Sequence, residues 1–106
     1  MEYRTLGRTG IRVSVIGYGA WAVGGDMWGP QDDRDTIASL KRAFELGCDF
    51  IDTAAVYGMG HSEEVVGAFL KETGAKAAVA TKVPPKNYRW PARKGTPIRD
   101  AFPKDH

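Results

Sequence analysis

Hydrophobic and polar positions change their spacing several times along the chain. Apolar residues alternate with polar ones at positions 3–6 and 11–15, on either side of the glycine-containing stretch 7–10. This pattern predicts a β-hairpin within residues 1–16. Short apolar runs follow in residues 15–19, 48–52 and 77–83, and each predicts a strand.

Two stretches between these strands have helical spacing. The first carries Ile37, Leu40 and Phe44 after an acidic start at residues 32–35, where carboxylates suit the positive end of a helix dipole, and Gly47 is the expected stop. The second is predicted to begin near Ser62 as its N-cap and to end at Gly74. Its apolar positions are Val65, Val66, Phe69 and Leu70, and Glu63 and Glu64 lie in its first turn.

Strands that alternate with helices predict a parallel sheet with right-handed crossovers, so the fold class is α/β. The stretch 17–83 holds this strand–helix–strand–helix–strand unit. Residues 84–106 hold five of the six prolines and no helical periodicity, so this tail is predicted to lack helices.

Composition narrows the class of protein. The 106 residues, 42% hydrophobic and 26% charged, fit one small globular domain. No apolar run is long enough to cross a membrane, and the first ten residues do not resemble a secretion signal. The single cysteine, Cys48, cannot form an internal disulfide; it is most simply a small apolar residue. We therefore expect a reducing, cytoplasmic setting.

Charge is unevenly distributed. Residues 82–106 carry a net charge of +5, which leaves −3 for residues 1–81. A basic segment with aromatic residues could bind nucleic acid. A loop over an anionic cofactor, or a solvated connector, explains the same pattern, and we favour these over a nucleic-acid partner.

A glycine motif suggests a dinucleotide site, but its context is wrong. Gly17, Gly19 and Ala22 fit the spacing G-x-G-x-x-A of a Rossmann fold. That motif opens directly into a helix, whereas about ten residues intervene here. The acid after the next strand, Asp52, also lies beyond the ~20 residues that the motif expects.

Polar residues at strand ends predict a different site. Asp52 ends the second strand of the unit, Lys82 lies at the end of the third, and Tyr57 follows Asp52 in the loop. Chemistry in parallel sheets gathers at the carboxyl ends of strands. A phenol becomes an effective proton donor beside an ammonium group, and a carboxylate can hold that ammonium in place. These residues predict a general acid, Tyr57, that protonates a carbonyl oxygen while hydride reaches its carbon.

Three segments resemble the aldo/keto reductase family. They are RTLGRTGIRVSVIGYGAWA, GCDFIDTAAVYGMGHSEEVVGAFL and ATKV, and together they cover most of residues 3–83. The middle segment contains the family's Asp-Thr-Ala, Tyr-Gly and Ser-Glu-x-x-x-Gly elements in order.

The resemblance implies the amino-terminal portion of a (β/α)8 TIM barrel, with three parallel strands and a hairpin that closes its bottom. It also implies NADPH-dependent reduction of aldehydes or ketones, with a small carbonyl compound as substrate. By the same resemblance, Asp52, Tyr57 and Lys82 are catalytic. The residues expected beside the nicotinamide are Gly19, Ala20, Trp21 and Asp52.

The sequence also departs from the family pattern. A complete barrel takes about 250 residues, so the fourth strand with the tetrad histidine, and most cofactor loops, are expected to lie outside these 106 residues. His61 is expected in an exposed loop and His106 before a third helix, so neither should replace that histidine. Trp21 and Trp28 could line a substrate pocket or simply pack on neighbours.

Two functional hypotheses follow. In the first, the chain is an aldo/keto reductase that is catalytic once the missing strands are supplied and inactive as an isolated chain. In the second, it is an inactive truncated relative that persists as a folded or interaction module. In either case, open strand edges favour self-association.

Overall fold

The computed structural model describes residues 1–25, 29–89 and 93–104. Its first element is the expected hairpin, formed by β1 (Tyr3–Thr5) and β2 (Arg12–Ser14). The two strands pair antiparallel, with Tyr3 opposite Ser14. Trp28 and His106 lie outside the described residues.

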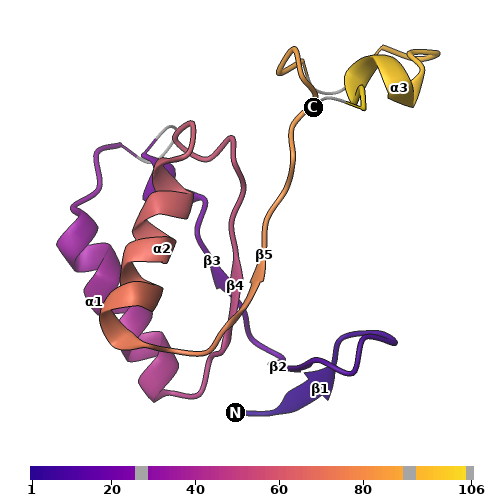
Figure 1. The fold of residues 1–106 in the computed structure, drawn as a ribbon. Helices are drawn as coiled ribbons and strands as arrows, with labels where there is room; N and C mark the ends of the chain where they lie inside the picture. Colours follow the sequence, from indigo (N-terminus) through magenta and orange to yellow (C-terminus); the bar gives the residue numbers. More distant parts are fainter. Residues whose placement is uncertain (26–28, 90–92, 105–106) are drawn as a thin grey trace.

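The second sheet has the predicted parallel topology. It contains β3 (Tyr18–Gly19), β4 (Phe50–Asp52) and β5 (Ala78–Ala80) in the order β3-β4-β5. Both pairings are parallel, as Figure 1 shows. β5 is shorter than predicted, so Lys82 lies two residues beyond its last residue.

The hairpin is attached to the amino end of this sheet. The Tyr3 hydroxyl donates to the Gly47 carbonyl at 2.8 Å, and the Ser14 N–H donates to the Asp49 carboxylate at 2.8 Å. The Asp49 N–H in turn donates to the Ser14 hydroxyl at 3.0 Å. Because Asp49 immediately precedes β4, the hairpin lies at the end of the sheet opposite the strand termini that carry Asp52 and Lys82.

Both predicted helices are present. α1 (Asp33–Glu45) is capped by Asp32, whose carboxylate accepts the Arg34 N–H at 2.9 Å. α2 (His61–Thr73) is followed by the predicted stop, Gly74, which is its C-cap residue and has a φ of 64°. Its start differs from the prediction, because the N-cap position is Gly60, with a φ of 99°. Ser62 is fully buried inside the first turn and does not cap the helix.

Two short helices were not predicted. After β3 the chain forms a single 3₁₀ turn, η1 (Ala22–Gly24), where a Rossmann motif would open a long α-helix. In the tail, α3 (Ile98–Ala101) contradicts the prediction that residues 84–106 lack helices. Pro97 occupies its N-cap position, so this proline precedes the helix without interrupting it.

The core lies between the parallel sheet and the two long helices, which run side by side along one face of the sheet in Figure 1. Phe44 and Phe69 bring the helices together, with ring centroids 5.1 Å apart. Among the described residues, no helix is long and apolar enough to cross a membrane. The buried cluster consists of Ala20, Val23, Leu40, Ile51, Val65, Val66 and Phe69.

Two leucines of the α1 region provide a matched test of this core. Leu40 is fully buried, whereas Leu46 is 58% exposed. We expect Leu40→Ala to lower the free energy of unfolding by about 2–5 kcal/mol, since it removes buried methyl groups and leaves a cavity. Leu46→Ala should change it by about 0.5 kcal/mol or less. Urea denaturation followed by circular dichroism measures both, and equal losses would contradict the assigned core.

Candidate active site

The register of the parallel strands brings the candidate residues to one edge of the sheet. Gly19 is paired with Asp52, and Asp52 with Ala80, so the three carboxyl ends are level. Backbone bonds continue past the strands: Thr53 N–H donates to the Ala80 carbonyl at 2.8 Å, and Ala55 N–H to the Lys82 carbonyl at 3.4 Å. Lys82 is therefore held beside the segment that follows β4.

The Lys82 ammonium group is the centre of the site. Its Nζ lies 2.8 Å from Asp52 Oδ1 and also donates to the Thr53 carbonyl at 2.8 Å. The hydrogen bond to Asp52 raises the pKa of Lys82 above its ordinary value of 10.5, against a smaller opposing effect of desolvation. The charge of Asp52 and the hydroxyl of Tyr57 add to the increase. Lys82 therefore carries a positive charge at neutral pH.

Tyr57 completes the predicted trio. The Lys82 Nζ lies 5.2 Å from the centroid of the Tyr57 ring. The backbone of Tyr57 is held at both ends, since its N–H donates to the Ala54 carbonyl at 3.1 Å and its carbonyl accepts the Ser62 N–H at 3.2 Å. The structure thus brings together Asp52, Tyr57 and Lys82.

The residues predicted beside a cofactor divide into two kinds. Trp21 is 46% exposed, and its ring stacks against that of Tyr57, with centroids 6.0 Å apart and 23° between the planes. Gly19 is exposed, and a Cβ atom added there would meet nothing within 4 Å. Ala20, by contrast, is fully buried in the core. Ala20 therefore packs in the core beneath the loop, and of these three residues only Gly19 and Trp21 are accessible to a cofactor.

Ser62 contributes a buried link that sequence reasoning missed. Its hydroxyl donates to the Ala20 carbonyl at 2.8 Å and lies 2.8 Å from Thr53 Oγ1. It therefore joins the end of β3 to the residue whose carbonyl accepts Lys82. A serine before two glutamates is also typical of a helix cap, and the sequence offers no signal to separate the two roles.

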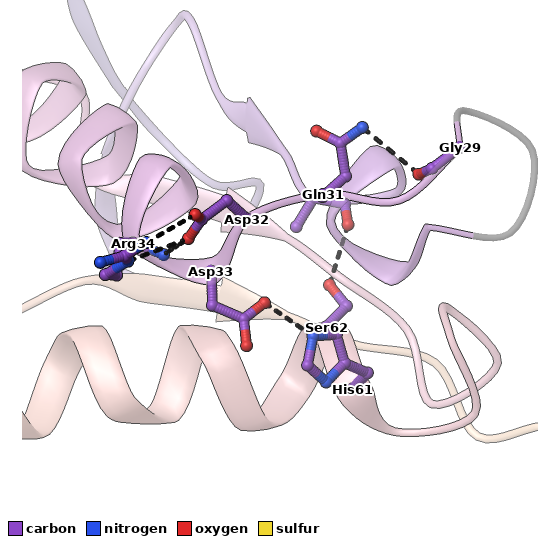
Figure 2. Close-up of polar contacts among 8 residues, drawn as sticks. Gly29, Gln31, Asp32, Asp33, Arg34, His61 and Ser62 are labelled. Carbon is purple, nitrogen blue, oxygen red and sulfur yellow. Dashed lines mark hydrogen bonds and ion pairs between the residues drawn. The ribbon is translucent and has the colours of Figure 1, made fainter.

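His61 is not in the exposed loop that was expected. It is the first residue of α2, and its Nε2 lies 2.8 Å from Asp33 Oδ1, as Figure 2 shows. Since Asp33 is the first residue of α1, the pair connects the beginnings of the two helices. This role is structural and gives no support to His61 as a catalytic histidine.

An apolar cleft of about 380 Å³ adjoins the Lys82 end of the site. It can accept an apolar group next to the polar trio. The cleft is lined by Val56, Lys82, Val83, Pro84, Pro85 and Phe102.

Within the described residues, no cluster of three or more His, Cys, Asp or Glu side chains could hold a metal ion.

Comparison with known proteins identifies the family of this chain. The model of the aldo/keto reductase family matches residues 15–99. The chain belongs to the aldo/keto reductase family. It is 48% identical over 84 residues to the aldo-keto reductase YhdN of Bacillus subtilis (strain 168), a match that covers 77% of this chain and 25% of that relative.

Two further relatives extend the comparison. L-Galactose dehydrogenase of Arabidopsis thaliana is 42% identical over 71 residues, which cover 67% of this chain and 22% of the relative. The solved glycerol dehydrogenase of Gluconobacter oxydans superposes with a TM-score of 0.67 and 43% identity, covering 76% of this chain and 25% of its own. These matches confirm the barrel-type fold, and the chain spans about a quarter of the length of these relatives.

The Asp52–Lys82 pair predicts a specific pH dependence of stability. Because the pKa of folded Lys82 is raised, the pair stabilises the fold fully below the ordinary lysine value of 10.5, and this contribution disappears as pH rises through the raised pKa. Both side chains are about half exposed, so the contribution should be about 1 kcal/mol or less.

The measurement is the difference in urea midpoint between the wild-type protein and Lys82→Met. We expect this difference to be constant between pH 7 and 9 and to shrink above pH 10.5. Lys76→Met is the control for loss of an exposed lysine, and its midpoint difference should stay small throughout. A Lys82→Met difference that grew with rising pH would contradict the pairing.

Proposed function

We propose that the residues of this chain form the proton-donating part of an NADPH-dependent reductase that converts aldehydes or ketones to alcohols. The observation that carries the proposal is the placement of the Lys82 ammonium group between the Asp52 carboxylate and the Tyr57 ring. Membership of the aldo/keto reductase family supports oxidoreductase chemistry at this position.

Each residue of the trio has a distinct role in this proposal. The Tyr57 hydroxyl donates its proton to the carbonyl oxygen of the substrate, and the Lys82 ammonium stabilises the phenolate that remains. Asp52 accepts a hydrogen bond from Lys82 at 2.8 Å, which positions the ammonium group and keeps it protonated. The cofactor, when bound, supplies the hydride that reaches the carbonyl carbon.

Gly19, Trp21 and Asp52 would hold the nicotinamide end of the cofactor. The open space at Gly19 and the exposed face of Trp21 suit a flat ring placed beside Tyr57. NADPH, with its additional phosphate, is proposed from the family resemblance, and the net charge of +5 on residues 82–106 is compatible with an anionic cofactor.

The proposed substrate is a small carbonyl compound whose apolar part occupies the cleft next to Lys82. Two relatives are named for the dehydrogenation of L-galactose and of glycerol, which are hydroxyl compounds. Oxidation of an alcohol and reduction of a carbonyl are the two directions of one reaction, so these names support the same chemistry. We also propose a reducing, cytoplasmic setting, because the single cysteine, Cys48, is buried as a free thiol.

We further propose that the isolated 106 residues are inactive. The side chains of Lys82 and Asp52 are 53% and 45% exposed, and water weakens electrostatic stabilisation at such a site. Activity then requires the rest of a barrel to cover this edge. The experiment therefore compares the isolated chain with a chimera. In the chimera, residues 15–99, which the family model matches, replace their counterpart in the Bacillus subtilis relative.

In the chimera, we expect Tyr57→Phe to lower kcat for aldehyde reduction by at least about 10²-fold, because the phenyl ring has no proton to donate. Oxidation of NADPH followed by absorbance measures this rate. Tyr88→Phe is the matched control: Tyr88 is 59% exposed in the tail, and its substitution should leave kcat unchanged.

The isolated chain separates the two hypotheses. Titration with NADPH, followed by nicotinamide fluorescence, should show no binding up to millimolar cofactor. Micromolar binding with aldehyde turnover would show that the chain works alone and would reject the proposed inactivity. An inactive chimera with an intact fold would instead favour a module that does no chemistry.

Self-association through β5 is proposed for the isolated chain. Val79 of β5 is paired in register with Ile51, and residues so paired face the same side of a sheet. Ile51 is fully buried, whereas Val79 is 41% exposed because β5 is the last strand of the described sheet. An uncovered edge strand of this kind is a template for another chain.

Light scattering after size-exclusion chromatography tests self-association through β5 directly. The chain should elute as a dimer or larger species at about 100 μM, and Val79→Lys should shift it toward the monomer, because a charge blocks edge pairing. Val56→Lys places the same charge at a loop residue of 42% exposure and should have no such effect. A wild-type chain that stays monomeric at this concentration argues against the proposal.

A further inference from the structure

Two glycines from separate loops meet backbone to backbone beside the candidate site. Gly24 ends η1, and Gly58 follows Tyr57 directly. A Cβ atom added to Gly24 would lie 2.4 Å from the Gly58 nitrogen and 2.6 Å from the Tyr57 carbonyl carbon. A Cβ atom added to Gly58 would lie 2.6 Å from the Gly24 oxygen and 2.8 Å from its Cα. Neither position therefore has room for a side chain.

The contact joins the segments that carry the two stacked rings. Gly24 belongs to the turn that begins at Trp21, since its N–H donates to the Trp21 carbonyl at 3.1 Å. Tyr57 precedes Gly58, and its ring stacks on Trp21 at 6.0 Å. The same Tyr57 ring lies 5.2 Å from the Lys82 ammonium. The glycine contact thus sets how closely the loop after β3 approaches the loop that holds the proposed acid.

The two glycines are required for different reasons. Gly58 has a φ of 63°, a left-handed conformation that a residue with a side chain adopts only at a cost, and it also lacks space. Gly24 is not among the residues with positive φ, so only the contact forbids a side chain there. A methyl group at Gly24 consequently tests the approach of the two loops without forcing alanine into a positive φ.

We propose that Gly24 and Gly58 are positioning residues that place the Tyr57 phenol between Trp21 and Lys82. The inference rests on the proposed role of Tyr57 as proton donor. A methyl group at Gly24 must push the Tyr57–Gly58 backbone outward, because the added carbon would lie only 2.4–2.6 Å from two atoms of that backbone. Displacement of a reacting group by about 1 Å can cost about 10²-fold in rate, so the effect should appear in kcat.

The first measurement is nuclear magnetic resonance on the wild-type 106-residue chain. It should show a nuclear Overhauser effect between the Gly24 Hα protons and the Gly58 amide proton, and another between the Trp21 and Tyr57 rings. A folded wild-type chain without the Gly24–Gly58 effect overturns the proposal, and this result does not depend on whether any variant folds.

The second measurement compares three alanine variants of the same chain. Gly24→Ala should lose the nuclear Overhauser effect between the Trp21 and Tyr57 rings (the ring effect) while α1 and α2 remain folded. Gly67→Ala, in α2, and Gly60→Ala, with a φ of 99°, have no atom within 4 Å of the added Cβ, and both should keep the ring effect. Gly60→Ala shows the effect of a disfavoured positive φ alone, a strain that Gly58 shares and Gly24 does not. Retention of the ring effect in folded Gly24→Ala would overturn the proposal.

Kinetics in the chimera distinguish this inference from the proposed function. Gly24→Ala should lower kcat by about 10²-fold with little change in the KM for NADPH, whereas Gly67→Ala should change neither. If Tyr57→Phe keeps full activity, the proposed function fails, and the ring effects still report on the placement. If Tyr57→Phe is inactive but Gly24→Ala is fully active, the function stands and the positioning role is rejected.

Discussion

The level ends of the three parallel strands are the constraint on which the site depends. Asp52 is paired with Gly19 on one side and with Ala80 on the other, so residues that follow these positions meet in space. Lys82 lies two residues past Ala80, and its Nζ reaches both the Asp52 carboxylate and the Thr53 carbonyl. A slip of one residue in the β4–β5 register would turn alternate side chains to the opposite face and separate this pair.

The placement of polar residues at the strand ends was predictable because it depends on local patterns. An apolar run that ends in Asp52, and another that leads to Lys82, indicate both the strands and the edge where their polar residues meet. The start of α1 was equally predictable, since the Asp32 carboxylate accepts a backbone N–H of the first turn, as a cap does. Asp32, Asp52 and Lys82 are polar residues at the ends of predicted elements, where the neighbouring sequence alone indicates where their side chains lie.

The missed features depend on tertiary contacts. Ser62 resembles a cap, but a buried hydroxyl needs partners, and the Ala20 carbonyl and Thr53 hydroxyl become available only after β3, β4 and α2 have packed together. The Asp33–His61 pair likewise joins helix starts 28 residues apart. The contact between Gly24 and Gly58 is similar, because no local pattern shows that two loops approach so closely. The short α3 escapes prediction for another reason: several prolines in a segment indicate that helices are absent, whereas Pro97 lies at the helix start, where proline is tolerated.

Solvent exposure then determines how strongly the charges of Lys82 and Asp52 interact with each other and with Tyr57. A pair of charges at hydrogen-bond distance interacts weakly in water, and more strongly where protein covers it. The described residues place helices on one face of the sheet, while Lys82, Asp52 and Trp21 remain about half exposed at its edge. The geometry of the Asp52–Lys82 pair and the Tyr57 ring is therefore set within the three-stranded unit, but the strength of their electrostatic interaction is not. The proposed chemistry needs a cover that excludes water. This need links the exposure of the trio to the exposure of Val79 on β5, because the strands of a complete barrel would cover both.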